Sequence, residues 1–320
     1  MVCAGSAARW AALLLMAAAS PLSGQKPKDG AADVQAEMRH VDYRVDSTIV
    51  LQIDYLRGEL LPTTDKPPYF DDKTSFTIGI DSAVISVSPA ALGQLLNRYV
   101  FAYPGSPLKS LSMTVEEGQL KQKGRLHGIS FTVLGDLTVT PEGDLRLHPT
   151  DIKTAGIKVG GLMKLFGLNL QKLVKLRGAP PGVQIEENDF ILSPAALLPP
   201  PKVRGKVKQV QVRDSAVINV FRSDRAKIEP LHPPDPDVKN YMFYKGGTLR
   251  FGKLTMVDAD LMIVDADQRD AFDFFLDAYN QQLVAGYDQN LPDHGLIVHM
   301  PDFRQTANLK QKGGLRPTKP

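Results

Sequence analysis

The residues of this chain that could do chemistry stand apart from one another in the sequence. Its histidines occur singly and its one cysteine precedes the first apolar run (His40, His127, His148, His232, His294, His299; Cys3). The spacings of a zinc protease, a serine hydrolase elbow, a phosphate-binding loop and a dinucleotide fingerprint are all missing from the sequence. We therefore expect no catalytic residue, no cofactor and no disulfide, and we expect each histidine to be a surface or packed side chain.

One acidic cluster has the oxygen chemistry of a calcium ligand set. It comprises Asp258, Asp260, Asp265, Asp267 and Asp270. In a strand, Asp258 and Asp260 would share one face, while Asp270 would cap the helix that follows it. Because the spacing of a calcium-binding loop is missing, we expect a solvated strand face with a helix cap, and no metal.

One basic row follows a proline-rich stretch. Lys202, Arg204, Lys206 and Lys208 occupy alternate positions, so in a strand all four would point the same way. Such a row could contact lipid phosphates at an anionic membrane surface, or it could protect a sheet edge as solvated side chains. Since no aromatic residues are interleaved with these cations, we expect no nucleic-acid partner.

A single amphipathic helix is predicted over Gly156–Gly178 from apolar residues at three- and four-residue steps. Its apolar face comprises Leu162, Leu165, Phe166, Leu170, Leu173 and Val174, and its flanks carry Lys164, Lys172 and Lys175. An ordinary core helix on a sheet accounts for this pattern, and so does a helix against bound lipid. In the second case the apolar face contacts acyl chains and the lysines contact headgroups.

The elements around this helix read as strands. Apolar residues fall on the odd positions of Val41–Tyr55, interrupted only at Ser47 and Val50, which predicts one long strand. Its odd face, with Ile49, Leu51 and Ile53, is a second candidate lipid-contacting surface. Further strands are predicted at Phe76–Val87, in an antiparallel meander over 108–159, at Val183–Leu192 and at Val217–Phe221. Short helices are predicted after Ser88 and Ser193, each followed by proline, and after Asp270, with Phe272 and Phe275 on the apolar face of the last.

Composition divides the chain. Residues 1–24 have the arginine, apolar run and small residues of a secretory signal peptide, cleaved between Ala19 and Gln25. We therefore expect an exported protein, periplasmic or extracellular, that is soluble or peripheral to a membrane. The expected parts after the signal are a β-rich domain at 33–229, a Pro-rich linker at 230–239, a C-terminal strand-helix-strand segment at 240–303 and a basic disordered tail at 304–320.

Charge is uneven along these parts. Between Lys109 and Arg213 there are 16 basic and 9 acidic residues, whereas between Asn240 and Asp302 there are 4 basic and 10 acidic residues. The first stretch could face an anionic surface and the second could not.

The run Leu111–Phe221 resembles the LmeA-like phospholipid-binding domain, long catalogued as a domain of unknown function. The matching features are a Glu-Glu-Gly turn, a Pro-Glu-Gly-Asp-Leu-Arg-Leu-x-Pro hairpin, a Leu-Met-Lys-Leu-Phe-Gly-Leu helix and a Pro-Pro-Gly-Val-Gln-Ile strand start. That family is similar to tubular lipid-binding proteins, so the resemblance implies a long curved sheet that wraps a helix and holds acyl chains. One branch of the family is linked to phospholipase activity, but no residue here matches a hydrolase site.

The sequence thus predicts an α+β fold with a long, curved, mostly antiparallel sheet wrapping one or two amphipathic helices, and a smaller C-terminal α+β segment. The expected function is an exported lipid-binding protein that holds a phospholipid, or another acyl or isoprenoid lipid, in an apolar groove. Two alternatives stay open: a structural or interaction protein of the cell envelope with a dry core, and a phospholipase-like hydrolase.

Overall fold

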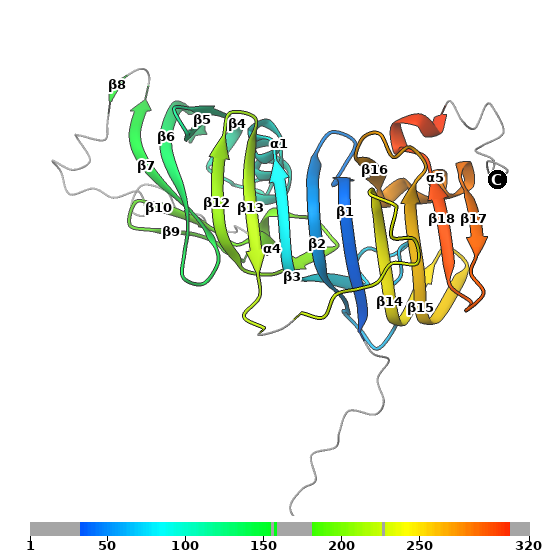
Figure 1. Cartoon of the computed structure of the whole chain (residues 1–320). Helices are drawn as coiled ribbons and strands as arrows, with labels where there is room; N and C mark the ends of the chain where they lie inside the picture. The colour runs from blue at the N-terminus through cyan, green and yellow to red at the C-terminus, as the bar shows by residue number, and fades with distance from the viewer. Residues whose placement is uncertain (1–32, 155–156, 159–180, 226–227, 308–320) are drawn as a thin grey trace, which may run out of the picture. The chain divides into compact units, whose positions relative to one another are not determined.

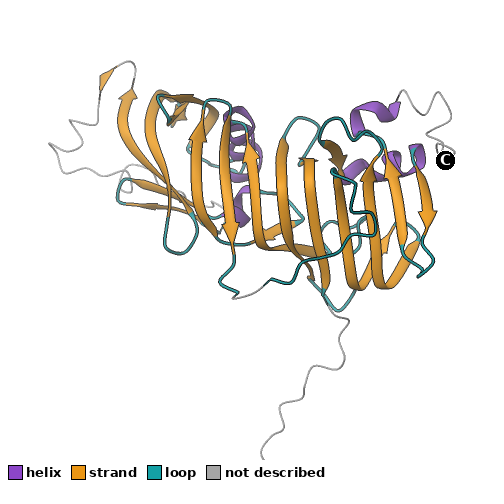
Figure 2. Cartoon of the chain, viewed as in Figure 1, coloured by secondary structure: helices purple, strands orange, loops and turns teal. Residues whose placement is uncertain are grey.

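A computed structural model describes residues 33–154, 157–158, 181–225 and 228–307 (Figure 1). Figure 2 shows that strands dominate the described residues and that the helices are short. The β-rich architecture expected from the alternating sequence patterns is therefore confirmed, and it includes a large, curved, open sheet.

Eleven strands of the described residues form this larger sheet, in the order β12-β13-β3-β2-β1-β14-β15-β18-β17, with β11 beside β3 and β16 beside β1. Most neighbours are antiparallel, and β11–β3, β16–β1 and β15–β18 are parallel. The strand bounds are β1 (Val34–Arg44), β2 (Val50–Pro62), β3 (Phe76–Val87), β11 (Lys202–Arg204), β12 (Val207–Arg213), β13 (Ala216–Arg222), β14 (Tyr241–Phe251), β15 (Leu254–Asp265), β16 (Phe272–Phe275), β17 (Tyr287–Asn290) and β18 (Leu296–Met300).

A second, antiparallel sheet has the order β4-β5-β6-β7-β10-β9, with β8 beside β7. It contains the predicted meander: β4 (Leu108–Glu116), β5 (Gln119–Leu126), β6 (Ile129–Val139), β7 (Leu145–Thr154) and β8 (Ile157–Lys158), followed by β9 (Val183–Glu186) and β10 (Asp189–Leu192). Buried residues of this sheet, such as Leu111 and Leu120, share one core with residues of the larger sheet, such as Leu56 and Val217.

The short helices sit at the places where the sequence breaks its strands. They are α1 (Pro89–Leu95) with its π-helical extension η1 (Leu96–Val100), α4 (Pro194–Leu197), η2 (Leu276–Ala278), α5 (Tyr279–Ala285) and η3 (Phe303–Gln305). The Ser88 hydroxyl accepts the Ala91 N–H at 3.1 Å, so the predicted N-cap of α1 is confirmed. Ser193 precedes α4 in the same extended conformation but makes no such hydrogen bond.

The long strand predicted over Val41–Tyr55 is wrong, because the chain turns between β1 and β2. Asp46 closes this turn by accepting the N–H groups of Thr48 and Ile49 at 2.8 and 2.9 Å. The register of the hairpin pairs odd residues with odd residues, for example Tyr43 with Leu51. Odd-numbered residues on both sides of the turn therefore still face the core, and this parity made the hairpin look like one strand.

The helix predicted to begin at Asp270 is also wrong at its start. Phe272–Phe275 is instead strand β16, which pairs in parallel with Val41–Arg44 of β1. Burial of Phe272 and Phe274 on one face accounts for the apolar spacing, and the helix begins only at Tyr279.

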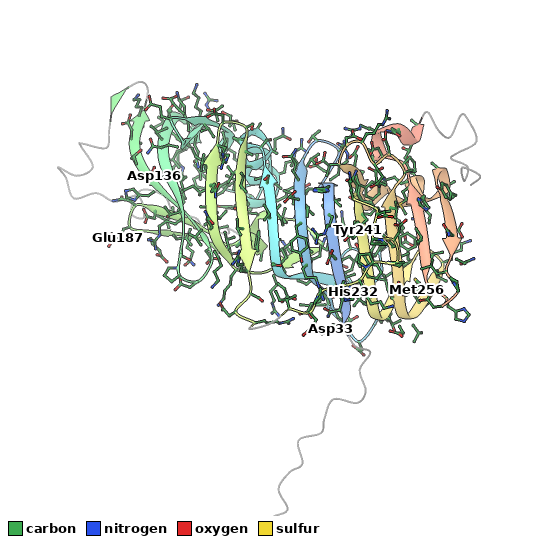
Figure 3. The ribbon with its side chains drawn as sticks, in the orientation of Figure 1. Asp33, Asp136, Glu187, His232, Tyr241 and Met256 are labelled. Carbon is green, nitrogen blue, oxygen red and sulfur yellow. The ribbon has the colours of Figure 1, made fainter. Side chains whose placement is uncertain are left out.

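The chain after the proline-rich stretch joins the same sheet. Strand β14 pairs with residues Gln35–Arg39 of β1, so strands from both sides of residues 230–239 lie in one sheet. Leu231 and Val238 pack against a second apolar cluster that includes Phe243 and Tyr241, which is labelled in Figure 3. The proline-rich stretch thus covers part of β14.

Candidate apolar ligand site

An apolar cavity of about 100 Å³ lies between the larger sheet and the helices α1 and α4. Two rows of side chains form its floor across adjacent strands. One row contains Tyr43, Leu51, Val87 and Val217, and the next contains Ile53, Ile85 and Asn219. Because residues i and i+2 of a strand point to one side of a sheet, the two rows line the same face.

Bulges keep this face apolar along the curved sheet. The β2–β3 register shifts between Ile53 and Tyr55, so Leu56, not Tyr55, returns to the cavity side. A second register shift, between Arg57 and Gly58, lets both Ile80 and Ile85 of β3 line the cavity. An inserted residue bends a strand and changes the face of the residues beyond it, which is why strict alternation stops predicting the wall here.

The helices supply the roof. Leu92 and Leu95 of α1 face the cavity, as do Leu197 of α4 and the segment Pro199–Pro201. The Lys202 ammonium donates to the Leu198 carbonyl at 2.6 Å, at the end of α4. This hydrogen bond ties the proline segment to β11 and so holds one side of the roof.

One end of the cavity is charged. Arg44, Lys73 and Asp277 belong to its lining, and the Lys73 ammonium donates to both carboxylate oxygens of Asp277 at 2.7 Å. The Lys73 and Asp277 side chains are 36% and 42% exposed, respectively, so this end reaches solvent. Arg44 is bound by Asp273. The site therefore combines a long apolar wall with a charged end that is open to solvent.

The predicted lipid-contacting residues fall into two groups. Leu51 and Ile53 line the cavity, whereas Ile49 is buried without belonging to its wall. The structure describes only Ile157 and Lys158 of the predicted helix Gly156–Gly178, as part of β8. The rest lies outside the described residues, including Leu162, Leu165, Phe166, Leu170, Leu173, Val174, Lys164, Lys172 and Lys175.

The predicted basic row does not form one strand. Lys202 and Arg204 lie on β11, the chain breaks from strand structure at Gly205 and Lys206, and Lys208 lies on β12. The ammonium groups of Lys206 and Lys208 both donate to Asp224, at 2.7 and 2.9 Å. The Asp224 carboxylate is held by both of these hydrogen bonds, and its pKa is lowered to about 2.

The acidic residues singled out in the sequence point to separate partners. Asp260 binds Lys245, Asp267 binds Arg269 and Asp270 binds Arg304. Asp265 is buried, where Asp267 N–H donates to one of its oxygens at 2.9 Å. Among the described residues, no group of three or more histidine, cysteine or acidic side chains is arranged to hold a metal ion.

Two histidines lie beside carboxylates, but outside the cavity wall. His148 Nδ1 is 2.6 Å from Asp189 Oδ1 on the smaller sheet, and His40 Nε2 is 3.4 Å from Asp54 Oδ1. Both histidine side chains are about half exposed. Neither pair meets a serine or a threonine in the described contacts.

Sequence reasoning missed Asn219, a buried amide in the cavity floor. Val217, Asn219 and Phe221 share the cavity face of β13, and all three are buried. The signal was present as a single amide inside the apolar stripe of a predicted strand. The sequence alone could not assign this amide to a cavity, because the side to which that strand face points depends on which strands pair with β13.

In the described part of the chain, none of the helices combines the length and the apolar character needed to cross a membrane. Comparison of the chain with family models, with curated proteins and with solved structures gives no match.

Proposed function

We propose that this protein is an exported lipid-binding protein that holds an acyl or isoprenoid chain in the cavity between the larger sheet and helices α1 and α4. The observation that carries the proposal is the wall itself, in which aliphatic residues from β2, β3, β13, α1 and α4 converge on unfilled space. A mainly aliphatic wall offers few hydrogen bonds to water, so it favours apolar occupants.

The size of the cavity limits how a lipid would enter. Its volume of about 100 Å³ is smaller than the roughly 150 Å³ of an engineered cavity that holds benzene. A segment of one chain would therefore occupy it, with the headgroup outside. Each square ångström of apolar surface removed from water contributes about 25 cal/mol to binding.

The charged end suits this orientation. Lys73 and Arg44 place two cations near the exposed end of the cavity, where the phosphate or carboxylate of a phospholipid would meet them. Their acidic partners, Asp277 and Asp273, temper that attraction. The resemblance to phospholipid-binding proteins, the signal-like residues 1–24 and the basic stretch between Lys109 and Arg213 favour the same proposal, including contact with an anionic membrane surface.

The first experiment is mass spectrometry of organic extracts from the mature protein purified without detergent. A stoichiometric phospholipid or isoprenoid is the expected result. A second assay measures the uptake of a phospholipid with a fluorescent acyl chain from phosphatidylglycerol vesicles. An empty extract together with no uptake would overturn the proposal in favour of an envelope protein with a dry core.

A matched pair of variants assigns the binding to this cavity. Ile85→Phe adds volume on the cavity face of β3, so uptake should fall at least several-fold. Val84→Phe places the same ring on the opposite face of the same strand, where Val84 lines a separate surface depression with Tyr55. Equal uptake by the two folded variants, checked by circular dichroism, would place the binding elsewhere.

A further inference from the structure

A buried amide side chain lies among the aliphatic residues of the cavity floor. Asn219 lies between Val217 and Phe221 on the cavity face of β13, and only 9% of it is exposed. Its cross-strand partners are Val210 on β12 and Ile85 on β3, and Ile85 in turn pairs with Ile53 on β2. An amide in such a row must find hydrogen-bond partners within the protein or in whatever fills the cavity.

Within the protein, only the NH2 group of this amide has hydrogen-bond partners. The Asn219 Nδ2 group donates to the carbonyls of Ile85 and Val217, each at 3.4 Å. The Oδ1 atom is buried and has no hydrogen-bond partner. Turning the amide over would point Oδ1 at two carbonyl oxygens, so the strands themselves fix the donor side and leave the acceptor facing away from them.

The wall residues next to Asn219 carry no donor for this oxygen. The cavity residues next to Asn219 along β13 and across on β3 are Val217, Phe221 and Ile85, whose side chains carry no N–H or O–H group. A purely hydrocarbon occupant would leave Oδ1 unpaired and would gain nothing from this group. An occupant with a hydroxyl group at this point could donate the missing hydrogen bond to Oδ1.

We infer that the cavity selects an aliphatic chain bearing a hydroxyl group, and that this hydroxyl donates a hydrogen bond to Asn219 Oδ1. The inference rests on the proposed function and names its ligand class, which includes both long-chain alcohols and hydroxylated acyl chains. Asn219 on β13 lies three strands from Arg44 on β1, or about 14 Å at ordinary strand spacing. The hydroxyl bound here is therefore distinct from a headgroup at the charged end.

The test uses two isomers of equal size, 1-hexanol and methyl pentyl ether, of which only the alcohol can donate a hydrogen bond. Both displace a fluorescent apolar probe, N-phenyl-1-naphthylamine, from the mature protein. The ratio of their affinities is compared between the wild-type chain and Asn219→Leu, which keeps the branching and the number of heavy atoms of the side chain and removes the amide. We expect the ratio to shift against the alcohol by about 3- to 10-fold in the variant, the value of one hydrogen bond.

A control variant separates this effect from general damage. Val217→Ala shortens an apolar side chain of the same wall and changes no polar group. It should therefore lower the affinity for both ligands and leave the ratio of the two affinities unaltered. An unchanged ratio in Asn219→Leu would overturn the hydroxyl assignment while leaving the apolar cavity site in place. Failure of both isomers to displace the probe from the wild-type protein would overturn the proposed function as well.

A measurement on the wild-type chain keeps the inference testable if Asn219→Leu does not fold. The side-chain amide resonance of Asn219 is followed by nuclear magnetic resonance during titration with each isomer. We expect 1-hexanol to move this resonance further than the ether does. Equal movement with both isomers would show that the hydroxyl does not reach Oδ1.

Discussion

Arg44 and Asp273 form a two-point ion pair that joins the first strand of the larger sheet to a strand 229 residues later. The Arg44 guanidinium donates to both carboxylate oxygens, with Nη2 at 3.0 Å from Oδ2. Asp273 is 1% exposed and lies on β16, which pairs in parallel with β1. The ion pair thus fastens β16 beside the charged end of the cavity.

Removing the cation should destabilise the fold. Arg44→Met leaves a buried carboxylate with the Arg304 backbone N–H, at 3.3 Å, and the Arg304 side chain as its remaining partners. We expect the free energy of unfolding in urea to fall by about 3 kcal/mol. Lys121→Met, which removes an exposed hairpin ion pair with Glu116, is the control and should change it little. Equal losses in both variants would contradict this account.

Asp46 should make the turn between β1 and β2 sensitive to acid. Burial pushes its pKa upward, but hydrogen bonds from the Thr48 N–H, Arg98, the Thr48 hydroxyl and the Ile49 N–H prevail and lower it to about 2. Because the folded-state pKa lies below the unfolded value of 3.8, the stabilisation is complete above pH 4 and is lost as the pH falls toward 2. Asp46→Ala should therefore cost about 1–2 kcal/mol at pH 7 and less at pH 2.

The measurement is urea unfolding of both proteins at several pH values between 2 and 7. Asp72→Ala is the comparison, because Asp72 accepts similar bonds from Thr74 in another turn, which also lower its pKa, but it binds no arginine; its pH-dependent loss should be smaller. A constant difference between wild type and Asp46→Ala across this range would rule out the carboxylate as its source.

Asp265 should act in the opposite direction. Burial is the main cause of a pKa raised to about 7, and nearby Asp302 and Asp267 add to it against hydrogen bonds from the Asp267 N–H and Asn240. The folded state therefore holds a proton that the unfolded state releases near pH 3.8. The resulting stabilisation is full below that pH and is lost as the pH rises through 7, by up to about 4 kcal/mol.

Asp265→Asn removes this titration, so its free energy of unfolding should vary less between pH 4 and 8 than that of the wild type. Exposed Asp258 lies on the same strand, and Asp258→Asn should keep the wild-type dependence. Thermal or urea unfolding across this range measures both. Identical pH profiles for wild type and Asp265→Asn would exclude Asp265 as the titrating group.

The sequence by itself determined the local elements. Strand β3, the meander β4–β7 and the N-cap at Ser88 follow from alternation, turn residues and capping chemistry within a few positions of the chain. It also determined which face of β1 and β2 is apolar near the turn, since Val41, Leu51 and Ile53 keep one parity through the hairpin.

Only the tertiary structure decided how these elements pair, because pairing joins residues that are distant in sequence. At the turn, the Asp46 carboxylate also accepts hydrogen bonds from Arg98 and Tyr99, which are about fifty residues away in the sequence. Phe272 belongs to a strand because β1 offers it an unpaired edge, although its spacing suits a helix. Asn219 becomes a cavity-lining residue only when β13 lies beside β3, which turns its side chain toward the cavity.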